Sequence, residues 1–446
     1  MTSEVVSLPE IRSDAVESKT MSRAVQPSLL EQSPACFACR RDCPIKGELL
    51  SLYNTAVKPN DYNARLSEFV SQLFNALAQM VQSKVIQDAD TLGITLGAIF
   101  DWCISLLYAE RTANTGWLYC PNAQMGFYPY IKSCPHCGRV EQTEISVHKP
   151  PSDTIGRYTT LCLGAILSEV CRVCQNGFEV RILPTSRGDV DMLIFDATTV
   201  VLCEVKSSPL YLLPLCVRYQ RPLETSEGDE LATVAAHAVI TVDNLESRAL
   251  YLYLVDGDPI PVRLVREDSA RYLSVEDSRN PERLREVLNA VRNSWARMYV
   301  GYASRWRENG QLRWFTCGCG VPVDDTKNAP GLDRTDDIKK GVYQMLKVAE
   351  KYGRGCKERR VRVALLSNMH PVAHYDEYLK GFEDALWTRE SDIQERTGQT
   401  VSVDSDDLLP FYDMLFTLTQ SWFRDERLKQ AFSVETLFRA LGGQQE

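Results

Sequence analysis

Residues 187–206, RGDVDMLIFDATTVVLCEVK, give the clearest indication of the fold of this chain. Two apolar runs rich in β-branched residues flank the polar segment DATT, and this pattern predicts a β-hairpin. With the turn centred in that segment, Asp191 lies directly opposite Glu204. Side chains two positions apart share one face of a strand, so Lys206 is expected beside both carboxylates. A register shifted by one residue would break this cluster.

The expected cluster of charges favours catalysis over packing. Carboxylates that lie close together cannot all stay ionised without a cation. Magnesium prefers oxygen ligands, which carboxylates and a substrate phosphate supply. A bound magnesium ion activates water and neutralises charge on a phosphate, and a lysine beside it can stabilise the same charge. The stretch therefore indicates metal-assisted phosphodiester hydrolysis, and the competing interpretation is a solvated strand face.

Further elements of an α/β domain flank the hairpin. Residues 154–174 have helical spacing, and Glu169 falls on a face whose other residues are mostly apolar. A long insertion, residues 207–332, follows the hairpin and is expected to be β-rich, with a helix near its end. After it, residues 335–352 predict a helix and residues 360–368 predict a strand.

A helix with a glutamate, then GFEV, GDVDMLI and CEVK in that order, resembles the PD-(D/E)XK nuclease superfamily, and more narrowly a type II restriction endonuclease. The resemblance implies an α/β fold with a mixed central sheet flanked by helices. It also implies a magnesium-dependent, site-specific deoxyribonuclease that acts on double-stranded DNA as a homodimer. The competing hypothesis is a non-catalytic, zinc-containing DNA-binding or regulatory protein with a nuclease-like core.

The same resemblance assigns roles to four residues. Asp191 and Glu204 would bind magnesium, Lys206 would be the catalytic lysine, and Glu169 would be an auxiliary acid. Val190 stands where the family has proline, so Asp189 remains an alternative to Asp191. We favour Asp191 because the apolar strand begins directly after it. Glu169 could instead be a surface residue of its helix.

The chain has 15 cysteines. Without a secretory signal, an odd number argues against a disulfide framework and for reduced thiols, some of which bind metal. CPHCG at 134–138 has the spacing of a zinc-binding turn, and CFAC at 36–39 is a second such pair. Pairing the two would close a tetrahedral site. The candidate zinc ligands are Cys36, Cys39, Cys43, Cys120, Cys134 and Cys137.

Other assignments of the cysteines stay open. His136 and His148 are weaker ligand candidates, and the CGC of 317–319 allows a second zinc site. An iron–sulfur cluster on the first three cysteines is the minority alternative. The CRVC of 171–174 lies in the predicted helix and is expected to be core.

The formal net charge of −9 excludes a protein that coats polyanions by bulk charge, so DNA contact requires a local patch. Residues 339–362 supply one, and phosphate contacts there would weaken steeply with salt. A solvated basic helix end is the competing interpretation. Its basic residues are Lys339, Lys340, Lys347, Lys351, Arg354, Lys357, Arg359, Arg360 and Arg362. The first candidates for base recognition are Arg263, Arg266, Arg271, Arg279 and Arg283, and the zinc region is the second.

Composition along the chain predicts four regions. These are a flexible arm (1–30), a helical cysteine-rich zinc-binding region (31–150), a nuclease core with its insertion (151–380), and a C-terminal helical region (381–446). One apolar run in the second region is long enough to span a bilayer. Asp101 lies at its centre, where a charge in lipid is costly, so we expect a buried helix in a soluble, cytoplasmic protein.

Overall fold

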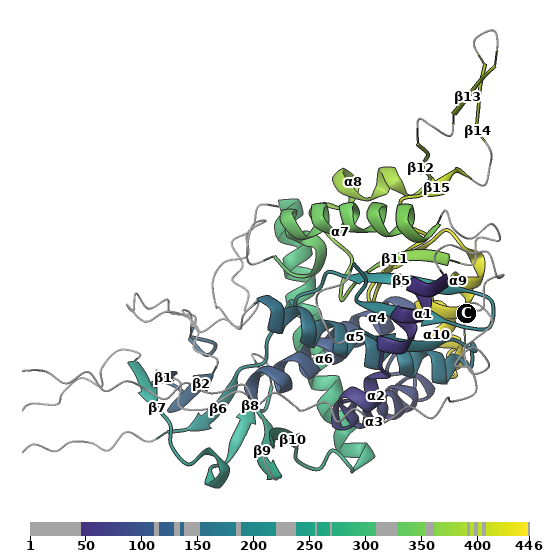
Figure 1. The fold of residues 1–446 in the computed structure, drawn as a ribbon. Helices are drawn as coiled ribbons and strands as arrows, with labels where there is room; N and C mark the ends of the chain where they lie inside the picture. The colour runs from purple at the N-terminus through teal and green to yellow at the C-terminus, as the bar shows by residue number, and fades with distance from the viewer. Residues whose placement is uncertain are drawn as a thin grey trace, which may run out of the picture.

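The computed structural model describes most of the chain as one α/β assembly of two large sheets and a layer of helices (Figure 1). The described residues are 46–110, 116–128, 134–137, 152–183, 189–219, 238–254, 257–267, 270–308, 329–353, 361–389, 393–396, 400–403 and 407–444. The mixed α/β class expected from the sequence is confirmed.

The first sheet is six-stranded and mixed. Its order is β17 (Trp422–Phe423), β16 (Met414–Thr417), β11 (Val361–Ser367), β5 (Val200–Val205), β4 (Met192–Phe195) and β3 (Glu179–Ile182). The three central strands β16, β11 and β5 are parallel, and the other pairs are antiparallel. Strands β4 and β5 are buried along their whole length and are apolar except for Glu204, as expected between two helical layers.

The two faces of this sheet belong to two different hydrophobic clusters, because strand side chains alternate. Met192 and Ile194 point to the cluster that contains α5 (Ser152–Cys174). Leu193 and Phe195 point to the cluster that contains α7 (Thr335–Val348). The two helices therefore cover opposite faces of the sheet, as Figure 1 shows.

The second sheet is seven-stranded and antiparallel throughout. Its order is β10 (Ala270–Val275), β9 (Ile260–Glu267), β8 (Leu250–Leu252), β6 (Leu215–Arg218), β2 (Met125–Tyr128), β1 (Gly116–Cys120) and β7 (Ala238–Thr241). The insertion is β-rich, as predicted. However, β1 and β2 come from the region expected to be separate and helical, so that expected boundary does not correspond to a structural one.

A helical layer joins the two sheets. It contains α3 (Ala64–Gln82), α4 (Ala89–Ala109), α6 (Pro281–Glu308) and α10 (Val434–Ala440). Asp88 caps α4 by accepting a hydrogen bond from the Thr91 N–H (2.6 Å). Gly97 in α4 allows close packing with α6, since a Cβ there would lie 2.6 Å from the Trp295 ring.

Helix α4 is, in the part of the chain that the structure describes, the one helix long and apolar enough to cross a membrane. It is instead buried in the protein, as expected for this helix from the sequence. Its Asp101 carboxylate accepts hydrogen bonds from the Tyr211 N–H and from the Trp295 indole N–H, both at 2.7 Å. A titratable group therefore lies in the core and is hydrogen-bonded to protein donors.

The C-terminal region was predicted to be helical, but it also contains strands. Strands β16 and β17 complete the six-stranded sheet, because their apolar side chains fill the face beside β11. The remaining elements are α1 (Lys46–Thr55), α2 (Pro59–Tyr62), α8 (Tyr375–Tyr378), α9 (Glu426–Phe432), and the short strands β12 (Leu386–Trp387), β13 (Ile393–Arg396), β14 (Thr400–Val403) and β15 (Leu409–Pro410).

Candidate functional site

The hairpin of β4 and β5 has the predicted register. Met192 pairs with Cys203 and Phe195 with Val200, so Asp191 lies opposite Glu204 at the end of the ladder. The Asp191 N–H donates to the Cys203 carbonyl at 2.8 Å. The turn is held by Asp196, whose carboxylate accepts from the Thr198 N–H (2.7 Å). This type of side-chain bond stabilises tight turns.

Asp191, Glu204 and Lys206 meet at this end of the sheet. One oxygen of Asp191, Oδ2, accepts a hydrogen bond from the Val205 N–H at 2.9 Å. The Lys206 ammonium donates to Glu204 Oε1. All three residues share the sheet face that carries Leu193 and Leu202, which is the α7 face.

Burial and charge set the protonation of this cluster. Burial and the neighbouring Asp191 carboxylate together raise the pKa of Glu204 to about 7, against the opposing effect of Lys206. Burial of Lys206 disfavours its charged form, but the Glu204 and Asp191 carboxylates outweigh that effect and raise the pKa of the lysine. Two carboxylates share one ammonium, so the cluster has an excess of negative charge. A divalent cation would stabilise both carboxylates in their ionised form.

Asp189 has a different environment from Asp191. Its Oδ1 accepts hydrogen bonds from Gln344 (2.9 Å) and Lys347 (2.6 Å), both on α7. The hydrogen bond from Lys347 holds the pKa of Asp189 below its usual range. Asp189 is therefore already paired with a helix, whereas Asp191 lies against Glu204. This geometry favours Asp191 as the metal-binding aspartate.

Glu169 does not join this cluster. It lies on α5, which packs against the opposite face of the sheet, and it pairs with Arg172 at 2.6 Å. It lines a separate groove of about 760 Å³ with Lys58, Glu68 and Glu179. The mostly apolar helix face correctly predicted that the Glu169 side chain is largely buried. The sequence of one helix, however, does not indicate which face of the sheet that helix covers. The expected auxiliary role is therefore not supported by its position.

Polar residues that the sequence pattern did not indicate hold the end of β5. The Lys206 N–H donates to the Leu366 carbonyl (2.9 Å), which ties β5 to β11. Just beyond, the Ser207 hydroxyl donates to Asn368 Oδ1 (2.8 Å), and the Asn368 amide donates to the Ser208 carbonyl (2.8 Å). Two serines directly after the lysine were the only signal in the sequence.

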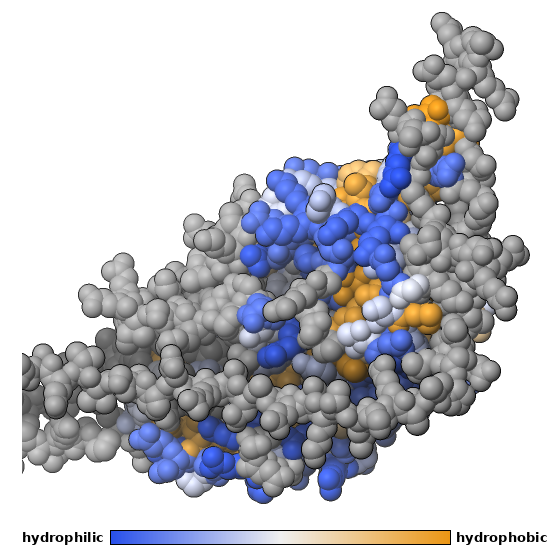
Figure 2. Space-filling view, viewed as in Figure 1, coloured by the Kyte–Doolittle hydropathy of each residue, from blue (hydrophilic) through white to orange (hydrophobic). Residues whose placement is uncertain are grey.

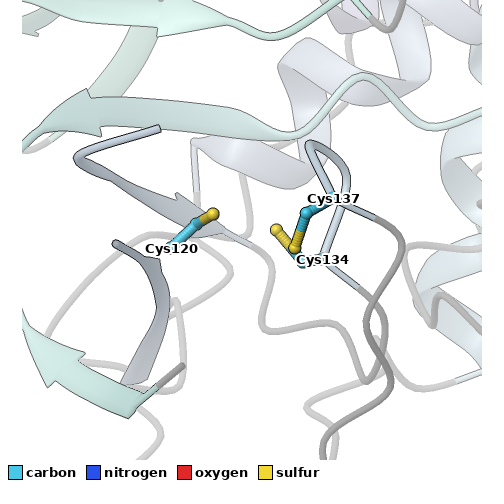
Figure 3. Close-up of side chains that lie close together, drawn as sticks. All are labelled: Cys120, Cys134 and Cys137. Atoms are coloured by element: carbon cyan, nitrogen blue, oxygen red, sulfur yellow. The ribbon is translucent and has the colours of Figure 1, made fainter. Parts of the chain in front are cut away.

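Three cysteines form a second candidate site, in the seven-stranded sheet. The sulfur atoms of Cys120, Cys134 and Cys137 all lie within 4.8 Å of one another, and Figure 3 shows them converging. All three are free thiols. Burial raises the pKa of Cys134 far above its usual range. This group could bind a metal ion such as zinc, since thiolates at this separation suit a tetrahedral centre.

Some of the other predicted metal ligands lie outside the described residues, and others are placed by the structure. Cys36, Cys39 and Cys43 lie outside the described residues, as do His148, Cys317 and Cys319. His136 is not part of the thiol group, and its Nδ1 lies 3.2 Å from the Tyr253 hydroxyl. Cys171 and Cys174 lie in α5, with Cys171 buried in the core, as predicted.

The predicted basic patch is partly neutralised in the structure. Lys347 pairs with Asp189, Lys351 with Glu48 (2.7 Å), and Arg362 with Asp425 (3.2 Å). Lys339 and Lys340 are exposed on α7, and Lys340 has no ion-pair partner among the described residues. Figure 2 shows hydrophilic residues gathered over α7. Arg354, Lys357, Arg359 and Arg360 lie outside the described residues.

The arginines proposed for base recognition lie on β9, on β10, in the segment before α6 and in the first turn of α6. Arg266 and Arg271 are cross-strand partners, so two positive charges meet there. Arg271 also lies 3.8 Å from Glu246, and Arg283 pairs with Glu286 at 3.1 Å. Arg263 lies 3.9 Å from Glu276 and Arg279 is exposed.

No protein-family model, curated protein or solved structure matches this chain. The function is therefore argued from the two sites themselves.

Proposed function

We propose that this protein is a magnesium-dependent DNA endonuclease, of the kind that cuts a specific double-stranded site. The observation that carries the proposal is the meeting of Asp191, Glu204 and Lys206 at one end of adjacent strands. The order helix, three strands, helix, strand around them is the order that the resemblance to PD-(D/E)XK nucleases calls for. A purely structural cluster would have no need of a second, half-buried carboxylate (Asp191) beside the Glu204–Lys206 ion pair.

The donor set fits magnesium. Asp191 accepts the Val205 N–H through Oδ2, and its carboxylate lies beside that of Glu204, so the two carboxylates would hold the ion together. A bound magnesium ion would polarise the scissile phosphate and lower the pKa of a water molecule. Lys206 would stabilise negative charge on the phosphate, because its raised pKa keeps it protonated. The Leu366 carbonyl positions the lysine through its backbone N–H.

The DNA surface and the assembly belong to the same proposal. Lys339 and Lys340 are exposed on α7, the helix that covers the sheet face carrying the cluster. A DNA phosphate backbone could therefore contact these lysines and the cluster at the same time. A homodimer would place two clusters on the two strands of a palindrome. The thiol group would bind zinc and stabilise the seven-stranded sheet, with no part in cleavage.

The test is cleavage of plasmid DNA in magnesium, with Lys206→Ala as the main variant. Wild-type protein should give discrete fragments, and the variant should lose activity by at least about 100-fold because charge stabilisation in an active site has that magnitude. DNA binding in calcium should be retained. Glu179→Gln is the matched control, since Glu179 lies on the same sheet and pairs with Arg181 at its edge (2.7 Å).

Two outcomes would contradict the proposal. If no DNA, whether plasmid, phage or synthetic duplex, is cut in magnesium or manganese, the enzyme is excluded. If such protein still binds duplex DNA, the non-catalytic alternative is favoured. If Lys206→Ala cuts as fast as wild type, the hairpin is not the active site.

A further inference from the structure

Helix α7 lies directly on the lysine of the carboxylate cluster. A Cβ at Gly341 would lie 3.5 Å from Lys206 Cγ and 3.0 Å from Leu365 Cδ1, so the helix backbone packs against the stem of the lysine. Three residues further along the helix, Gln344 donates a hydrogen bond to Asp189 Oδ1 at 2.9 Å. The row of α7 that contains these residues therefore faces the cluster.

The same row begins with a carboxylate, Asp337. Residues four apart share one face of a helix, so Asp337 lies one turn before Gly341 on the side that faces the cluster. Its side chain is 24% exposed, whereas its neighbour Asp336 is fully exposed to solvent on the outer side. Burial opposes the charge of Lys206, but the carboxylates of the sheet and that of Asp337 outweigh it and raise the pKa of the lysine. Lys206 therefore interacts with a carboxylate on α7 as well as with those on the sheet.

A metal ion in the cluster would compete with this lysine. The Lys206 ammonium donates to Glu204 Oε1, on the carboxylate that the proposed ion needs. Like charges repel, so an ion bound to Glu204 displaces the ammonium. The first turn of α7 is the positive end of the helix and disfavours an ammonium unless a carboxylate lies beside it. Asp337 supplies that carboxylate, and it already pairs with one cation, Arg334, at 3.1 Å.

We propose that Asp337 is a positioning residue for Lys206. When a divalent ion occupies Asp191 and Glu204, Asp337 takes the ammonium from Glu204 and keeps it beside the cluster, within reach of a bound phosphate. The inference rests on the proposed function, because it needs the metal site on the sheet. It adds that the site is completed by a residue of α7, a helix on the other side of the long insertion.

The test is a double-mutant cycle on Mn²⁺ binding, which needs no DNA. Full-length, zinc-loaded protein is titrated with Mn²⁺ by calorimetry, for wild type, Asp337→Asn, Lys206→Ala and the double variant. Asp337→Asn should raise the Kd by about tenfold, a size typical of coupling between neighbouring charged residues. In the Lys206→Ala background the same substitution should change the Kd by less than about twofold, because no ammonium remains to be displaced.

Asp336→Asn is the matched control. It removes the same charge one residue away, on the exposed side of α7, and should change the Kd by less than about twofold because solvent and salt screen it. Asp337→Glu keeps the carboxylate and should restore most of the affinity.

The outcomes separate the inference from the proposed function. Equal effects of Asp337→Asn and Asp336→Asn, or an equal effect of Asp337→Asn with and without Lys206, would overturn the inference and leave the metal site standing. Wild-type protein that binds no Mn²⁺, or Mn²⁺ binding that Asp191→Asn leaves unchanged, would overturn the metal site and the inference together.

Discussion

The two candidate sites are built in opposite ways. The carboxylate cluster of the six-stranded sheet brings together residues that face one another across a strand pair, and it includes a cation, Lys206. The thiol group beside the seven-stranded sheet brings together residues from two short turns, and all three of its side chains are cysteines. Oxygen ligands with a water-accessible lysine suit a hard ion that acts on a substrate. Buried sulfur ligands suit a soft ion that holds structure.

The thiol group depends mainly on local turn geometry, whereas the carboxylate cluster depends on the pairing of two strands. A turn fixes its two thiolates by local spacing alone, whereas Asp191 and Glu204 meet only if the strands pair in one register. The two sites should therefore respond differently to metal removal, to substitution and to pH.

Zinc removal should have the largest effect. We expect a zinc-selective chelator to lower the melting temperature and to unfold β1 and β2, because structural zinc binding is worth on the order of 10 kcal/mol. Omission of magnesium should abolish cleavage and leave the melting temperature nearly unchanged. Calorimetry and a plasmid assay on the same samples measure both. Equal melting with and without zinc would remove the structural role.

Asp191→Asn should come next. Loss of one metal-binding carboxylate should reduce the cleavage rate by about 10²- to 10³-fold, as with other losses of charge stabilisation. Asp189→Asn, which breaks the contacts with Gln344 and Lys347, should reduce it less. Single-turnover rates at saturating magnesium compare the two. A larger loss in Asp189→Asn would reverse our choice between the aspartates.

Asp101→Asn tests the core between the sites. Burial raises the pKa of Asp101 to about 8, so the folded state holds its proton more tightly than the unfolded state, where the pKa is 3.8. Its contribution to stability is therefore complete below pH 4 and is lost as pH rises to 8, by about 1.4 kcal/mol per unit. Urea unfolding at pH 5 and pH 8 should show a smaller difference in the variant than in wild type. An equal difference would contradict this pKa.

Glu169→Gln should have the smallest effect. The residue pairs with Arg172, whose side chain is 53% exposed, so the ion pair should contribute less than about 1 kcal/mol. Cleavage should stay within about twofold of wild type, because α5 covers the opposite face of the sheet from the cluster. A loss comparable to that of Asp191→Asn would restore the auxiliary role expected from the sequence.

Local patterns predicted the elements and the hairpin well. The DATT turn between two apolar runs gave the register that brings Asp191 to Glu204, and Cys-Pro-His-Cys gave two of the three thiols. The helix over 335–352 is present, although its last turn widens into a π-helix, Ala349–Gly353. In each case the information lies within about 20 consecutive residues.

Long-range arrangement could not be predicted from those patterns. Nothing in residues 154–174 states which face of the sheet the helix covers, so Glu169 was placed with the wrong neighbours. Asp333 is buried and accepts hydrogen bonds from Tyr302 and from the N–H groups of Val372 and Ala373, partners that the sequence around it does not indicate. Both outcomes depend on segments distant in sequence, which a local pattern does not contain.

The link between the two sheets has a consequence for how the protein loses its structure. Residues 208–214 run from the end of β5 to β6 and are buried throughout. Helix α4 holds this link with two hydrogen bonds. The Tyr211 N–H donates to the Asp101 carboxylate, and the Leu213 N–H donates to the Ser105 hydroxyl oxygen (2.9 Å). Such a buried, hydrogen-bonded link is rigid and does not allow the two sheets to move independently. Heating should therefore melt both sheets in one cooperative step, and neither is expected to survive as an independent fragment.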